Sequence, residues 1–105
     1  MQPMSDENQI DIPLSFIALF VDPGRIKPRE PRAFIAQRYE LCEDLATMLV
    51  DHAETQLWTS GATHADVLDR MHRGLLDGDG GLAPPEAQWV ARRLAELLGW
   101  DWQPQ

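Results

Sequence analysis

Residues 31–58 read PRAFIAQRYELCEDLATMLVDHAETQLW, and this stretch decides the fold. At about 100° of rotation per residue, its apolar side chains fill an arc of roughly 200° on a helix. A surface helix needs an apolar stripe only a little over ~100° wide. The members of the arc are Phe34, Ile35, Tyr39, Leu41, Cys42, Leu45, Ala46, Met48, Leu49, Val50, Ala53 and Leu57. We therefore expect one long helix that is covered from two directions, as the central element of a small helical domain or of an oligomer.

Two further helices follow the long one. Thr63 and Asp66 are spaced as in a capping box with Asp in place of Glu, which predicts a helix start. Residues 84–86 (PPE) open the last helix, because proline is tolerated in the first turn. Gly99 suits the C′ position at its end, where Trp100 would make the accompanying apolar contact. An arc of about 120° on this last helix holds Ala87, Val90, Ala91, Leu94, Leu97 and Leu98.

The segment before the long helix is shorter and less decisive. Residues 14–21 read LSFIALFV, where periodicity alone does not separate a strand from a helix. A short helix is favoured, with Asp11 near the cap and Pro13 in the first turn, because a lone strand would have no partner. The chain is therefore predicted to be all-α, a small bundle of three main helices plus a short N-terminal helix.

The length and composition predict one domain. A chain of 105 residues is about one domain long. We expect residues 1–11, which are polar, to be a mobile N-terminus, residues 12–100 to form a single helical domain, and residues 101–105 to be a C-terminal tail.

The charge and the lone cysteine restrict the partners and the compartment. Seventeen Asp and Glu against nine Lys and Arg give a net charge of −8, which argues against nucleic acid as a partner because phosphates would be repelled. No segment approaches the ~18–20 apolar residues that span a bilayer, so no membrane partner is expected. Cys42 has no second cysteine to pair with, which makes a cytoplasmic location the default.

Motifs for catalysis, cofactors and metals are missing from the sequence. The only lysine, Lys27, is not part of a GxxxxGK phosphate loop, and no GxGxxG is present. Residues 77–82 (DGDGGL) resemble the start of a calcium loop but fail its pattern at three positions. His64 and His72 lie ~12 Å apart along a helix, too far to share one zinc. We expect no enzymatic activity, no cofactor and no metal.

Three residues on the apolar arc of the long helix make a candidate pocket. Arg38 and His52 fall among the apolar positions, and Cys42 occupies the middle of the same face. Buried polar groups need partners, so these residues are either satisfied interior groups or the lining of a ligand pocket. The pocket interpretation supports an alternative function, a ligand-sensing helical domain.

Two surface features favour a protein partner. The segment 24–32, GRIKPREPR, places Arg25, Lys27, Arg29 and Arg32 on a stiff proline-rich loop of an acidic chain. The loop either folds back on the acidic side of the long helix or docks to an acidic partner or an anion.

The second feature is an aromatic residue of the last helix. Trp89 points away from the predicted apolar arc and lies three and four residues before Arg92 and Arg93. An exposed Trp flanked by Arg is typical of a binding anchor. The alternative is that the N-terminal segment covers Trp89.

Four strings resemble a known group of proteins. These are PLSFIALF (residues 13–20), RYELCED (38–44), DVLDR with RGL (66–70 and 73–75) and WVARRLAELLGW (89–100). They are similar to small proteobacterial proteins labelled "ATPase with chaperone activity", over about residues 10–100. The resemblance implies ATP and chaperone work, but the chain has no phosphate loop and no Walker-type acid, so no functional residue is carried over.

The sequence as a whole predicts a non-enzymatic adaptor, accessory or chaperone-like protein of bacterial type that binds a larger protein assembly. Its contacts would be the 24–32 loop and the Trp89 face. A homodimer through the wide face of the long helix is a further expectation, because such a patch can meet its own copy.

Overall fold

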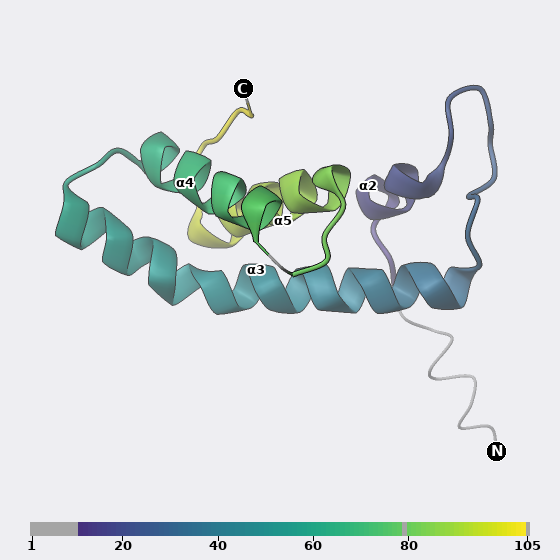
Figure 1. Cartoon of the computed structure of the whole chain (residues 1–105), viewed down its shortest axis with the longest axis horizontal. Coiled ribbons are helices and arrows are strands. Elements are labelled where there is room, and N and C mark those ends of the chain that lie inside the picture. The colour runs from purple at the N-terminus through teal and green to yellow at the C-terminus, as the bar shows by residue number, and fades with distance from the viewer. Residues whose placement is uncertain (1–10, 79, 105) are drawn as a thin grey trace, which may run out of the picture. The chain divides into compact units, whose positions relative to one another are not determined.

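The computed structural model describes residues 11–78 and 80–104. Its elements in chain order are α2 (Leu14–Ile17), the 3₁₀ turn η1 (Ala18–Phe20), α3 (Arg32–Ser60), α4 (His64–Asp77) and α5 (Pro84–Leu98). The regular structure of these residues is entirely helical, which confirms the predicted all-α bundle of three main helices and a short N-terminal one (Figure 1). The expected mobile segment 1–11 lies outside the described residues except for Asp11, and Asp79 of the calcium-like segment lies outside them too.

The chain divides into two compact units, Met1–Leu41 and Cys42–Gln105, and the boundary falls within α3. In the first unit, α2 begins at Leu14 because the carbonyl of Pro13 accepts the N–H groups of Phe16 and Ile17 at 2.9 and 3.1 Å. Pro13 itself is extended and occupies the N-cap. The expectation that Pro13 lies inside the first turn is therefore wrong, and although Asp11 lies two residues before the cap, no side chain makes a capping hydrogen bond there.

The core of the first unit is aromatic. The Phe16 ring is fully buried and lies 5.6 Å from the rings of both Phe20 and Tyr39. The Phe20 ring meets the Phe34 ring edge-on at 6.1 Å. These contacts join α2 and η1 to the first turns of α3, and edge-to-face pairs of this kind add to the stabilisation from burial alone.

In the second unit three helices meet around one apolar core. In Figure 1, α4 and α5 lie side by side over the C-terminal half of α3. Ala53 comes from α3, three residues from α4 and three from α5, and Trp102 closes the core from beyond α5. The full set is Ala53, Val67, Leu68, Met71, Ala91, Leu94, Ala95 and Trp102.

The predicted helix ends of the second unit are largely confirmed. The Thr63 hydroxyl accepts the N–H of Asp66 at 3.1 Å, so Thr63 is the N-cap of α4. Gly99 is left-handed, with φ +73°, and its N–H donates to Glu96 while the N–H of Trp100 donates to Ala95. This is the Schellman arrangement, in which glycine is favoured because it has no Cβ.

The burial of α3 differs from the expectation. Cys42, Ala46 and Ala53 have no exposed surface, whereas Met48 is 71% exposed and Trp58 is 85% exposed. The buried stripe is narrow, and from Cys42 onward its fully buried members are small side chains, which let neighbouring helices approach closely. A single chain therefore leaves part of the 200° face exposed, and cover by a second copy, the other of the two expected arrangements, stays a prediction.

Candidate interaction surface

The loop between η1 and α3 is held in shape from its first turn. The N–H of Arg25 donates to the carbonyl of Asp22 at 3.0 Å. Pro23 and Gly24 occupy the two central positions of this turn, and Gly24 has φ +79°. A type II turn has this pattern, because its third residue needs a positive φ. The turn leads into residues 25–27, all of which are exposed.

Arg29 closes the other side of the loop. Its N–H donates to the carbonyl of Phe20 at 2.8 Å, and its guanidinium lies 3.2 Å from Asp22 Oδ1 and 3.4 Å from the carbonyl of Leu19. The same guanidinium sits over the Phe20 ring, 5.4 Å from its centre. Arg29, predicted to contact a partner, therefore has a structural role in closing the loop.

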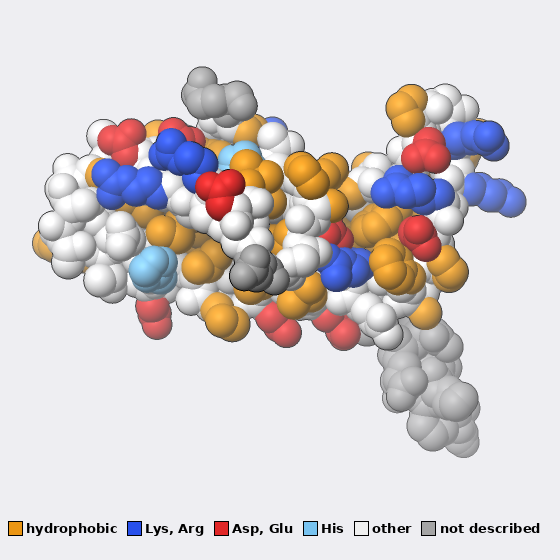
Figure 2. Space-filling model, viewed as in Figure 1, with side chains coloured by type: hydrophobic (Ala, Val, Ile, Leu, Met, Phe, Trp, Pro, Cys, Tyr) orange, Lys and Arg blue, Asp and Glu red, His pale blue; other side chains and the backbone are white. Residues whose placement is uncertain are grey.

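The tip of the loop presents an isolated apolar side chain between two cations. Ile26 is 93% exposed, and Arg25 and Lys27 on either side are exposed too. We call residues 22–29 the finger. It encloses an open hollow of about 430 Å³, and Figure 2 shows Lys and Arg side chains gathered over this part of the chain. The tip is thus a small, basic and apolar surface.

The alternative in which the loop folds back on acidic residues does not hold for the tip. Among residues 11–78 and 80–104, neither the Arg25 nor the Lys27 side chain has an ion-pair partner. The acidic partner of the finger is Asp22, which belongs to the finger itself. Arg32, the fourth predicted cation, is exposed at the first residue of α3.

Trp89 is buried, with 8% of its surface exposed, so the prediction of an exposed anchor there is wrong.

The buried arc of α5 is wider than predicted. It also includes Glu86 and Ala95, whereas Leu97 of the predicted arc is 40% exposed. At 100° per residue the buried positions span about 240°. α5 is therefore the most enclosed helix, a position that the sequence assigned to the long helix.

Of the two arginines that follow Trp89, Arg93 binds carboxylates of its own unit and so stabilises the fold. Arg93 binds both carboxylate oxygens of Glu43, with Nε–Oε1 at 2.9 Å and Nη2–Oε2 at 3.0 Å, and it also binds Glu96. These hydrogen bonds to Glu43, and then to Glu96, raise the pKa of Arg93 above its ordinary value although burial opposes the rise. Arg92 is exposed. The predicted Trp89 face thus reduces to one exposed cation.

The three residues of the candidate pocket on the long helix differ in burial. Cys42 is fully buried, whereas His52, expected among the buried positions, is exposed to solvent. The expectation for His52 was wrong because the buried stripe of α3 is narrower than the predicted apolar arc, and His52 lies outside that stripe. Arg38 is half-buried in the first unit. The ligand-sensing alternative stays a prediction.

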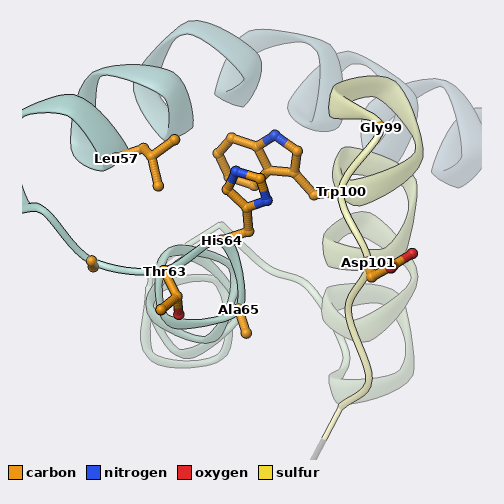
Figure 3. A pocket seen from close by; sticks show the side chains of 8 residues that line it. Leu57, Thr63, His64, Ala65, Gly99, Trp100 and Asp101 are labelled. Atoms are coloured by element: carbon orange, nitrogen blue, oxygen red, sulfur yellow. The ribbon is translucent and has the colours of Figure 1, made fainter.

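An open hollow of about 530 Å³ lies where the last residues of the chain pass α4. Figure 3 shows the rings of His64 and Trp100 stacked face to face, with Leu57 beside them and Asp101 directed away. The ring centres are 4.2 Å apart and the planes differ by 3°. The stacked rings of His64 and Trp100 thus cover one face of each other and form part of the lining of this open hollow.

Trp102 makes a second contact of the same kind, which sequence reasoning missed. Its indole N–H donates to Asp69 Oδ1 at 2.8 Å, and its ring meets His72 edge-on at 5.4 Å. Trp102 is a core residue, although the sequence placed it in a tail. The sequence does contain two histidines on one helix and two tryptophans in a Trp-x-Trp pattern. Each histidine contacts one of these tryptophans, but the pairing is visible only when the positions of both segments are known.

Neither metal nor membrane is indicated by the described residues. Within residues 11–78 and 80–104, no three His, Cys, Asp or Glu side chains are grouped so that they could hold a metal ion. No helix in that same part of the chain has the length and apolar character needed to cross a membrane.

Comparison with protein-family models, with curated proteins and with solved structures gives no significant match. The resemblance drawn from the sequence stays a prediction.

Proposed function

We propose that this chain is a small non-enzymatic adaptor or accessory protein, chaperone-like in that it binds a protein partner within a larger assembly, and that the finger is its docking element. One observation supports this more than any other. Ile26 is held 93% exposed between two cations on a loop that is closed at its base by Arg29. Burying an exposed Ile side chain contributes roughly 1.5–3 kcal/mol, so the finger offers an unused apolar anchor.

The order of the finger strengthens the proposal. Binding costs free energy for each side chain and loop that must be immobilised. The turn at residues 22–25 and the contacts of Arg29 hold the backbone before any partner arrives. A loop prepared in this way loses little conformational entropy on docking, which is what a binding anchor requires.

The chemistry of the finger indicates the partner. Two cations around one aliphatic side chain fit a protein surface with an apolar depression and carboxylates at its rim. Nucleic acid fits poorly because the chain as a whole carries a net charge of −8. A cytoplasmic site of action is part of the proposal, since the sequence given holds one cysteine, Cys42, and a disulfide within it needs two.

Affinity capture of the tagged full chain from its host tests the proposal. The Ile26→Asp variant and the Arg25→Glu/Lys27→Glu variant should each recover at least ~10-fold less of the captured protein, because the first removes the anchor and the second reverses both cations. The matched control is Arg70→Glu/Arg73→Glu on α4, which changes the net charge by the same amount at exposed positions. Equal capture by the finger variants and the control would overturn the finger as the docking element.

A further inference from the structure

A helix face in the second unit is exposed although it carries large apolar side chains. Met48 and Trp58 are 71% and 85% exposed, and Asp51 and Glu54 between them in sequence are exposed as well. At 100° per residue these four side chains share an arc of about 120° on α3. We call this arc the outer face. No described helix covers it, and exposed apolar side chains rimmed by charge are typical of interaction surfaces.

The outer face and the finger are complementary in chemistry. The finger presents Ile26 between two cations, and the outer face presents two carboxylates between two apolar side chains. Arg25 and Lys27 lie two residues apart, at most about 7 Å along the chain. Asp51 and Glu54 lie three apart on a helix, about 5–6 Å between their Cβ atoms. Both ion pairs can therefore form together while Ile26 packs on an apolar neighbour.

The distribution of charge along the chain favours the same pairing. Residues 42–105 hold eleven Asp and Glu against four Arg, and so carry −7 of the net charge of −8. Residues 11–41 hold five Lys and Arg against four Asp and Glu. A basic finger on one copy is therefore complementary in charge to the acidic second unit of another copy, whereas two outer faces would repel each other.

We propose that the finger of one copy docks on the outer face of α3 in a second copy. This rests on the finger being a docking element, as proposed above, and it names the occupant as the chain itself. The two contacting surfaces differ, so each can be reversed in charge without touching the other. A pair of complementary variants can therefore restore a contact that each variant alone has lost.

Sedimentation velocity of the pure full chain over a wide concentration range tests the pairing. The wild-type chain should associate reversibly as concentration rises. The Arg25→Glu/Lys27→Glu variant and the Asp51→Lys/Glu54→Lys variant should each associate at least ~10-fold more weakly, and an equimolar mixture of the two should regain association. The matched controls are Arg70→Glu/Arg73→Glu and Asp77→Lys/Asp101→Lys, which reverse exposed charges elsewhere and should associate like the wild type. Helical circular dichroism of every variant verifies that each is folded.

Three results would overturn the pairing. They are a wild-type chain that stays monomeric throughout, finger variants that associate like the wild type, and a mixture that stays dissociated although the wild type associates. The capture experiment separates these failures from failure of the proposed function. If the chain is monomeric but Ile26→Asp still reduces capture of a partner, the finger remains the docking element. Only the proposal that a second copy occupies it is then overturned.

Discussion

At the scale of single residues, the side chains that looked like binding groups in the sequence divide into those that hold the fold and those that face solvent. Arg29 and Arg93 belong to the first group, because each binds a carboxylate of its own unit. Arg25 and Lys27 belong to the second group. The sequence predicts the cationic character of all four but not this division, since it depends on where Asp22 and Glu43 come to lie.

Arg29→Met is predicted to loosen the finger without unfolding the protein. The change removes the ion pair with Asp22, the hydrogen bond to the Leu19 carbonyl and the contact with the Phe20 ring. Amide hydrogen exchange over residues 22–29 should speed up at least ~10-fold, while the free energy of unfolding falls by less than about 1 kcal/mol because the pair is exposed. Arg25→Met is the control and should leave exchange unchanged. Unchanged exchange in both variants would show that Arg29 does not hold the loop.

Trp102→Phe is predicted to lower the free energy of unfolding by about 1 kcal/mol or more. The variant keeps an aromatic ring in the core but leaves Asp69 without its indole donor, and the loss of a hydrogen bond to a charged group typically has that magnitude. Urea unfolding followed by circular dichroism measures the change. Asp69→Asn retains an acceptor oxygen and should cost less. A Trp102→Phe variant as stable as the wild type would mean that the terminal segment is not docked.

At the scale of elements, the helix ends of the second unit could be predicted from the sequence, whereas the surroundings of its helices could not. Thr63 and Gly99 act through backbone groups within a few residues, so their roles as caps follow from local sequence. The burial of Trp89 depends on residues far from it in the chain. The wide face of α3 was misjudged for a related reason, because burial there falls on small residues such as Ala46 and Ala53 while Met48 faces solvent.

Two glycines of the second unit are predicted to respond to alanine in opposite directions. Gly74 lies inside α4, and a Cβ there would meet no atom within 4 Å, so Gly74→Ala should stabilise the protein by about 0.5–1 kcal/mol through the backbone entropy of the unfolded chain. Gly99 has equally open space but a φ of +73°, so Gly99→Ala should destabilise it by about 1 kcal/mol. Thermal unfolding compares the two variants directly. A Gly99→Ala variant at least as stable as the wild type would contradict the left-handed cap at Gly99, and a destabilised Gly74→Ala variant would contradict the open space at Gly74.

At the scale of the whole molecule, charge and apolar surface are distributed unevenly along the chain. Residues 42–105 carry nearly all of the net negative charge, whereas the finger places two exposed cations and Ile26 in solvent. The sequence was sufficient to predict an all-α protein and to single out the basic loop. It could not predict that the loop is ordered by Arg29 or that Ile26 is its tip, because both depend on contacts with η1.

Site-specific photo-crosslinking in the host tests most directly whether the finger is the docking element. An apolar photoreactive residue, which keeps an apolar side chain at the anchor, replaces Ile26 in one variant and exposed Arg73 of α4 in another, with equal expression of both. The account predicts a discrete covalent product from position 26, containing a second copy of the chain or a protein partner, and none from position 73. Products from position 73 alone, or from neither position, would contradict it.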